Sequence, residues 1–247
     1  MRYFYFLPVI FFLWSCKQPL CVKDGKFEKI SVNNLPAFEN IHFHQGIRLY
    51  IQESPQRKME IRIPEKLKQF LNYEITNNTL EIEITKQCVF RDDSKAVEIT
   101  VYTPDLKKII NSSEYAVTSI DTLHFPKMTL ISENYAVPDS PAVGDFNLLV
   151  DNQQIHLIAN NLSAFYLSGR TGKLTIGFYS RAPRLFAKTL YANHIIVNHH
   201  SNSDLEVYPV DEIKGDIYAT GDVLIYHRPP VINVREHWEG RLIVVSE

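Results

Sequence analysis

The sequence predicts an all-β protein whose larger part is a parallel β-helix, a solenoid of short strands stacked coil upon coil. Aromatic residues are plentiful, with 13 Tyr and 14 Phe in 247 residues, and β-branched residues are common, which favours strands. Residues 112–117, Ser-Ser-Glu-Tyr-Ala-Val, are echoed 20 positions later by Ser-Glu-Asn-Tyr-Ala-Val at residues 132–137. A repeat of this length is typical of a solenoid, in which each unit covers the apolar face of the next. A β-sandwich with a strand about every 8–12 residues is the competing architecture, and the direct echo favours the solenoid.

Residues 1–15 are predicted to be a lipoprotein signal peptide rather than part of the fold. Arg2 supplies the positive start, and the apolar run that follows is shorter than the roughly 20 residues that span a bilayer. The tetrapeptide Leu-Trp-Ser-Cys at residues 13–16 resembles the site at which a peptidase cleaves and Cys16 is lipidated. The alternative is an ordinary signal peptide or an uncleaved anchor with an incidental cysteine. Lipidation predicts an outer-membrane lipoprotein of the cell envelope, on its periplasmic or surface face, with a polar tether over residues 16–26.

Two further cysteines, Cys21 and Cys88, form an even pair in a chain that would be exported to a compartment where disulfides persist. A disulfide between them is a hypothesis, with two unpaired thiols as the alternative. No Cys-x-x-Cys motif occurs, so the cysteines predict no metal site, and no cofactor is expected. Loss of Arg2 with the signal peptide leaves 25 of the 26 basic residues against 28 acidic ones, a net charge of −3. This balance argues against a nucleic-acid partner, which would require a clustered basic face.

Ahead of the repeats, apolar and polar residues alternate in runs that predict strands. Gly46 is expected to mark a turn or a bulge between two runs, and Asn77-Asn78 to form the turn of a hairpin. Residues 65–72 are the one stretch expected to be helical. The strands are predicted to pack on the solenoid or to continue it, so that residues 27–247 form a single domain.

Apolar residues recur at nearly constant spacing between residues 108 and 226, where each coil is expected to bury them against its neighbour. One series, with steps of 20, 18 and 19, is Ile110, Leu130, Leu148 and Leu167; a second, with steps of 20 and 21, is Ile176, Ile196 and Ile217. The step of 9 between the series predicts a shift of phase by half a unit. Turns are expected at Asn111-Ser112-Ser113, Asp151-Asn152, Ser168-Gly169, Ser201-Asn202-Ser203 and Thr220-Gly221-Asp222. Residues 238–245 are predicted to be a last strand that closes the solenoid.

Two groups of histidines are candidates for a metal site. His42 and His44 stand two apart on a predicted strand and so share a face, with Glu39 and Glu53 as the nearest acids. The second group, around a later strand and turn, consists of His194, His199, His200 and Asp204. In both groups a solvated strand face or turn is the favoured interpretation, and no metal site is predicted.

A cluster of Asp residues would indicate an enzyme, because parallel β-helices include enzymes that cleave acidic polysaccharides with Asp side chains on one strand face. Asp151, Asp204 and Asp222 stand singly, and the adjacent Asp92-Asp93 would point apart in a strand. No nucleophile lies in a Gly-x-Ser-x-Gly context, and no Gly-rich phosphate loop occurs. We therefore expect no catalytic activity.

Tyrosines are the favoured candidates for a binding surface. Tyr115 and Tyr135 repeat at the spacing of one coil, and facing outward they would stack into a platform for sugar rings or a protein partner. Tyr179 and Tyr218 extend the candidate surface into the later coils. The alternative is that these rings pack against the core or between coils and serve stability alone.

The order of several segments along the chain resembles one family of exported bacterial proteins, the "putative auto-transporter adhesin, head GIN domain". The segments are Phe-Glu-Asn-Ile at residues 38–41, Gly-Ile-Arg-Leu-Tyr-Ile at 46–51, Leu67, Asn-Thr-Leu-Glu-Ile at 78–82, residues 97–109, and Gly-Asp-Val-Leu-Ile-Tyr at 221–226 before Pro229 and Pro230. Of the Ser-Gly turns common in the family, this chain keeps Ser168-Gly169.

The resemblance implies a right-handed parallel β-helix and an adhesin-like or envelope role. The expected function is that of a non-catalytic cell-envelope lipoprotein that binds a glycan or a protein surface. A structural or assembly module of the envelope without an external ligand is the first alternative, and a polysaccharide-acting enzyme is the second.

Overall fold

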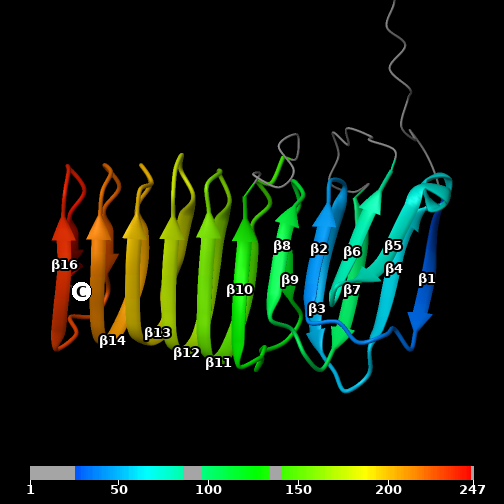
Figure 1. The fold of residues 1–247 in the computed structure, drawn as a ribbon, viewed down its shortest axis with the longest axis horizontal. Helices are drawn as coiled ribbons and strands as arrows, with labels where there is room; N and C mark the ends of the chain where they lie inside the picture. Colours follow the sequence, from blue (N-terminus) through cyan, green and yellow to red (C-terminus); the bar gives the residue numbers. More distant parts are fainter. Residues whose placement is uncertain (1–25, 86–95, 134–140, 246–247) are drawn as a thin grey trace, which may run out of the picture.

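The structure, a computed structural model, describes residues 26–85, 96–133 and 141–245. Within them, 17 strands form a single sheet with mostly parallel strands, and one short 3-10 helix lies between two of the strands (Figure 1). The elements are β1 (Phe27–Asn33), β2 (Asn40–His44), β3 (Ile47–Glu53), β4 (Lys58–Pro64), η1 (Glu65–Phe70), β5 (Leu71–Thr76), β6 (Thr79–Ile84), β7 (Val97–Thr103), β8 (Lys108–Ser112), β9 (Val117–Ser119), β10 (Lys127–Ser132), β11 (Phe146–Ala159), β12 (Ala164–Phe178), β13 (Arg184–His199), β14 (Leu205–Ile217), β15 (Val223–Ile225), β16 (Val231–Glu236) and β17 (Leu242–Val244). No helix in the described part of the chain is long and apolar enough to cross a membrane.

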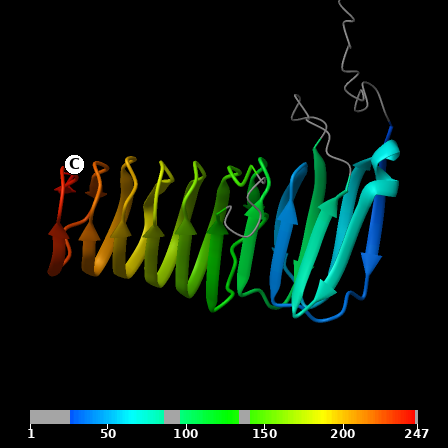
Figure 2. The same ribbon diagram turned by 45° about the horizontal axis from the view of Figure 1, so that its top comes forward.

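Each of the long strands lies parallel to the one before it, about one repeat further along the chain. Phe146 faces Phe165, Phe165 faces Leu185, and Leu185 faces Leu205, so the paired positions differ by 19, 20 and 20. The predicted length of the repeat is therefore confirmed. Figure 2 shows the strands standing side by side along the long axis, with the N-terminal strands at one end and the C-terminus at the other.

Every repeat contributes two strand segments rather than one, which we call its first and second halves. The first half of β11 pairs with β9, and its second half pairs with β10, so the sheet bends along a line through the long strands. Inward side chains from both halves, such as Leu148 and Leu157, belong to one continuous apolar core. Alternation places every second residue inside, and successive repeats cover one another's apolar side chains.

This two-part repeat corrects the predicted phase shift. Leu148 and Leu167 are paired in the first halves, as expected, whereas Ile176 lies in the second half of the same strand as Leu167 and pairs with Val197. The two series therefore follow the two halves of each repeat, without any shift between them. Three anchors were also assigned to the wrong position: Leu130 lies in a second-half strand and pairs with Leu157, and Ile110 and Ile196 are only half-buried.

Two of the predicted turns are wrong, because those residues lie inside long strands. Asp151-Asn152 lies in β11, and Ser168-Gly169 lies in β12. Gly169 has a φ of +103° and pairs with Val150, so its backbone bends the strand while the ladder continues. The predicted turns at residues 111–113, 201–203 and 220–222 do lie at the ends of strands.

The N-terminal strands both continue the sheet and cover its end. β2 lies parallel between β6 and β8, and β3 lies parallel between β7 and β9, so the early β2–β3 segment is inserted as one coil between later segments. β1, β4 and β5 are antiparallel and cover that end of the sheet. Gly46 (φ 86°) turns between β2 and β3, and Asn77 and Asn78 have positive φ in the β5–β6 hairpin, as predicted.

Candidate binding surface

Only part of the predicted tyrosine surface faces solvent. Tyr115 is 6% exposed, which corrects the expectation that it faces outward. The turn that carries it is held from inside, because the Ser113 hydroxyl donates to the Ile47 carbonyl and the Asn111 amide donates to the Tyr115 carbonyl. The first copy of the echoed segment thus serves a buried turn, and the Arg48 guanidinium covers the Tyr115 ring at 5.2 Å.

Tyr135 and the three cysteines Cys16, Cys21 and Cys88 lie outside the described residues, as do Asp92 and Asp93.

Tyr179 and Tyr218 are 46% and 40% exposed and occupy equivalent positions of the repeat. Each directly follows a second-half strand, as do the two rings aligned with them. We call this set the ring column: Tyr179, His200, Tyr218 and His237. The Tyr218 ring stacks on both histidines, with centroids 4.3 Å from His200 and 4.4 Å from His237. Sequence reasoning found the two tyrosines, but it assigned His200 to a turn and did not single out His237.

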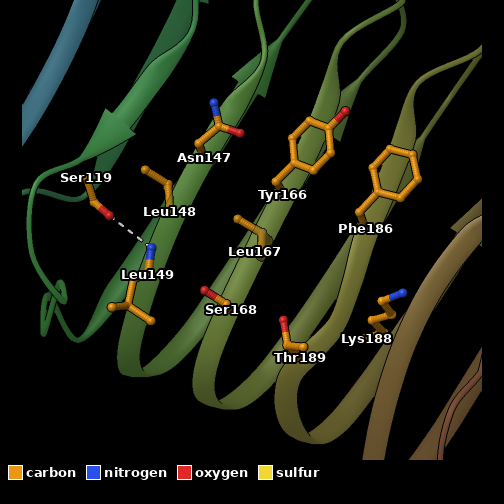
Figure 3. A pocket seen from close by; sticks show the side chains of 10 residues that line it. All are labelled: Ser119, Asn147, Leu148, Leu149, Tyr166, Leu167, Ser168, Phe186, Lys188 and Thr189. Carbon is orange, nitrogen blue, oxygen red and sulfur yellow. Dashed lines mark hydrogen bonds between the residues drawn. The ribbon is translucent and has the colours of Figure 1, made fainter.

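A second surface, which sequence reasoning missed, is an open groove across the first halves of the long strands (Figure 3). Its volume is about 440 Å³, and its lining comes from β9, β11, β12 and β13. The lining residues are Ser119, Asn147, Leu148, Leu149, Tyr166, Leu167, Ser168, Phe186, Lys188 and Thr189. Because these residues repeat at the coil spacing, the groove presents rows of aligned side chains.

Two aromatic rings dominate one row of the groove. Asn147 faces Tyr166 in the ladder, and Tyr166 faces Phe186. The Tyr166 and Phe186 rings stack with centroids 4.8 Å apart and planes 11° from parallel. Tyr166 is 42% exposed, as is Leu149 in the neighbouring row. Phe186 stands one repeat after Tyr166, so the repeat itself was the signal that could have located the pair.

A bulge in β13 shapes the other side of the groove. Between its pairings to Tyr166 and Ser168, β13 carries one residue more than β12, which places Lys188 beside Thr189 on the rim. Bulges re-aim side chains and are common next to functional sites. The Lys188 ammonium lies 4.0 Å from the Glu206 carboxylate, and that carboxylate is the only acidic partner of Lys188 among the described residues. Small hydroxyl side chains and one cation therefore face the two rings across the groove.

Two of the Asp residues considered for catalysis, Asp204 and Asp222, accept backbone hydrogen bonds. Asp204 and Asp222 lie at aligned positions of successive repeats, which corrects the expectation that they stand singly. The Asp204 carboxylate accepts the amide N–H of Asp222 at 2.8 Å, and the Asp222 carboxylate accepts the amide N–H of Arg241 at 2.8 Å. Asp151 is exposed and lies in β11, away from both. Asp151 therefore does not join the two aligned carboxylates.

The histidine groups behave differently from each other. His194, His199 and His200 do not converge: His194 is exposed beside Glu212, His199 is buried, and His200 joins the ring column. His42 and His44 do share a face, as predicted, but the acid that meets them is Glu81 of β6. The expected neighbours face elsewhere, since Glu39 pairs with Lys107 and Glu53 with His124.

Comparisons with known proteins place the fold among described relatives. The chain is similar to the crystal structure of a putative adhesin from Bacteroides fragilis (TM-score 0.77, 16% identity, 89% of this chain and 97% of that one). It is also similar to a putative adhesin from Parabacteroides merdae (TM-score 0.60, 12% identity, 90% and 98% covered). A third similar structure is a putative lipid binding protein from Parabacteroides distasonis (TM-score 0.56, 15% identity, 90% and 98% covered). At these identities the likeness shows the fold alone.

No curated protein matches the chain. The family match, in contrast, covers residues 37–229, from just before β2 to the segment between β15 and β16. It includes the inserted β2–β3 segment, the groove and most of the ring column. The chain therefore belongs to the family described as "Putative auto-transporter adhesin, head GIN domain".

Proposed function

We propose that this protein is a non-catalytic lipoprotein of the cell envelope that binds glycans, in an adhesin-like manner, through the groove of Figure 3. The observation that carries the proposal is the exposed, stacked pair of Tyr166 and Phe186 beside hydroxyl and amide side chains. The finer description of the fold as a right-handed parallel β-helix belongs to the same proposal. The parallel pairing of each long strand with its counterpart one repeat later supports it.

The chemistry of the groove suits a sugar better than a purely apolar ligand. The C–H faces of a pyranose carry a small positive charge and pack well on an aromatic face, which is electron-rich. Sugar hydroxyls would exchange hydrogen bonds with Asn147, Ser168 and Thr189, all of which line the groove. A few directed polar groups on a largely apolar surface are the usual basis of orientation and specificity in a binding site.

The membrane attachment in this proposal depends on Cys16. Lipidation of this residue would hold the protein at the outer membrane, on its periplasmic or its surface face, and residues 16–26 would tether the sheet. A disulfide between Cys21 and Cys88 would join the tether to the folded part. Replacing Cys16 by Ser is expected to move the protein from the membrane fraction to the soluble fraction, and retention at the membrane would contradict the lipid anchor.

A second candidate is a structural or assembly module of the envelope, favoured by the exposed C-terminal end of the sheet. β16 and β17 are the last strands of the second and first halves, and their apolar residues Val231, Ile232, Ile243 and Val244 are 37–48% exposed. The predicted closing strand is present as β17, but it leaves this end uncovered by other described residues. A strand from an envelope protein could extend such an edge by main-chain hydrogen bonds.

The deciding experiment is a glycan-array screen with the full-length chain in detergent, followed by affinity measurements on any hit. Tyr166→Ala is expected to weaken binding at least tenfold, about 1.4 kcal/mol. Tyr191→Ala is the matched control, because Tyr191 is 46% exposed on β13 but does not line the groove. Equal losses in both variants, or no glycan bound by the unaltered chain, would refute the proposal. If mass spectrometry finds that glycans are shortened after incubation with the protein, the result would instead favour a polysaccharide-acting enzyme.

A further inference from the structure

His42, His44 and Glu81 form a compact group on the outer face of two adjacent parallel strands. His42 and His44 alternate outward along β2, and His42 is directly paired with Glu81 of the neighbouring β6. On the other side of β2, Ser112 of β8 faces His44. The acid and the histidines are distant in sequence, and the insertion of β2 beside β6 brings them together.

The ring nitrogens converge on one carboxylate oxygen. Glu81 Oε1 lies 3.0 Å from His42 Nδ1 and is in close contact with His44 Nε2. Each of the three residues offers one possible ligand atom, and these three atoms all lie within 4.8 Å of one another. Bonds of about 2.0–2.2 Å at a tetrahedral angle separate two ligand atoms by roughly 3.3 Å. The group therefore needs only small side-chain rotations to surround an ion.

The geometry points to a binding site for a divalent transition metal ion of the zinc class, held by His42, His44 and Glu81. Two imidazoles and one carboxylate are ligands that zinc accepts, with a fourth position left to water. Because the ion would tie β2 to β6, it would stabilise the non-sequential junction of the sheet. This site is separate from the glycan groove and does not depend on that proposal.

The surroundings favour a cation. Glu74 and Glu83 line an open groove of about 370 Å³ together with Glu81, Asn72 and Tyr73, so solvent and ions have access from that side. Ser112 Oγ lies 2.9 Å from His42 Nε2, the ring atom not facing Glu81, as an outer partner that orients a ligand imidazole.

Zinc titration of the untagged full-length chain tests this site. Isothermal calorimetry is expected to give one equivalent of Zn²⁺ per chain, with a rise in the thermal midpoint, because the ion binds the folded state. Glu81→Gln and His44→Gln should each weaken Zn²⁺ binding at least tenfold. His194→Gln should not, although His194 also lies next to a carboxylate, at 3.6 Å from Glu212. Equal Zn²⁺ affinity in all three variants would overturn the assignment.

A second measurement keeps the test decisive where a variant fails to fold. Co²⁺ added to the unaltered protein should give ligand-field absorption that saturates at one equivalent and is displaced by Zn²⁺. Absence of a saturable band, together with no effect of Zn²⁺ on the thermal midpoint, would show that the group is a hydrogen-bonded network without a metal.

Discussion

Lowering the pH from 7 to 4 is expected to reduce the free energy of unfolding by about 3 kcal/mol through His199 alone. This side chain is 0% exposed, and neither ring nitrogen has a hydrogen-bond partner of good geometry among the described residues. Burial lowers its pKa from 6.5 to about 4, although nearby backbone groups of Gly221 and Ser203 act in the opposite direction. In the ladder His199 stands between two apolar residues, Phe178 and Ile217.

The sign follows from the direction of the pKa shift. A histidine with a lowered folded pKa binds protons more weakly in the folded state, so the folded state loses stability as the pH falls below 6.5, and the loss levels off below about 4. At about 1.36 kcal/mol per pKa unit, the loss is about 2 kcal/mol by pH 5 and about 3 kcal/mol by pH 4. Above pH 7 the group contributes no pH dependence.

The assay is urea unfolding followed by far-UV circular dichroism at pH 7, 6, 5 and 4, on the unaltered chain and on His199→Leu. Leu fills a similar volume and leaves no unpaired nitrogen, so the variant should be about as stable at pH 7. The difference between the two proteins isolates His199, because His42 and His156, whose pKa values are also lowered, titrate in both. A difference that changes by less than about 0.5 kcal/mol between pH 7 and pH 4 would refute the reasoning.

Three further predictions concern the sheet and the metal group. Gly169→Ala should destabilise the protein by about 2 kcal/mol or more, because the φ of Gly169 is +103° and an added Cβ would lie 2.0 Å from the Val150 carbonyl oxygen. Thermal unfolding measures this loss, with Ser168→Ala as the control variant. Phe165→Ala should cost about 3–5 kcal/mol by urea unfolding, because Phe165 is fully buried against Phe146 at 4.8 Å, while Tyr166→Ala on the outer face should cost far less. Zn²⁺ affinity should be weaker at pH 5.5 than at pH 7.5, because protons compete with the metal for the imidazoles, and calorimetry at the two pH values would detect the difference. Unchanged affinity at the two pH values would mean that histidines are not ligands.

The sequence predicted the repeats well because their contacts are local in the chain. Alternation and a nearly constant offset are visible in the sequence itself, and the pairing of Leu148 with Leu167 follows from them. The positions of the two halves of each repeat were not predicted, because the long strands bend at positions such as Gly169 without an interruption of their pairing. The polar residues at those bends are typical of turns, which is why turns were predicted there.

The candidate sites depended on pairings that spacing alone does not reveal. Glu81 meets His42 only because β2 is inserted next to β6, and nothing in the local sequence of either strand indicates this neighbour. Tyr166 and Phe186 could have been found, since they follow the repeat, but an outward position lacks the apolar pattern that marks a buried one. The bulge in β13 changes the spacing on the far side of the groove, so the repeat does not place Lys188 there.

The inserted β2–β3 segment also sets an order for folding. Leu49 of β3 pairs with Val117 of β9, more than three repeats further along the chain, whereas each later strand pairs with a segment only one repeat away. Closing the longer loop costs more chain entropy and is slower. In a chain that emerges from its N-terminus, β2 and β3 must wait, unpaired, until β6 to β9 have appeared. The end of the sheet that contains β2 and β3 would therefore consolidate only after β9 has emerged, and until then these strands are exposed to proteases and chaperones.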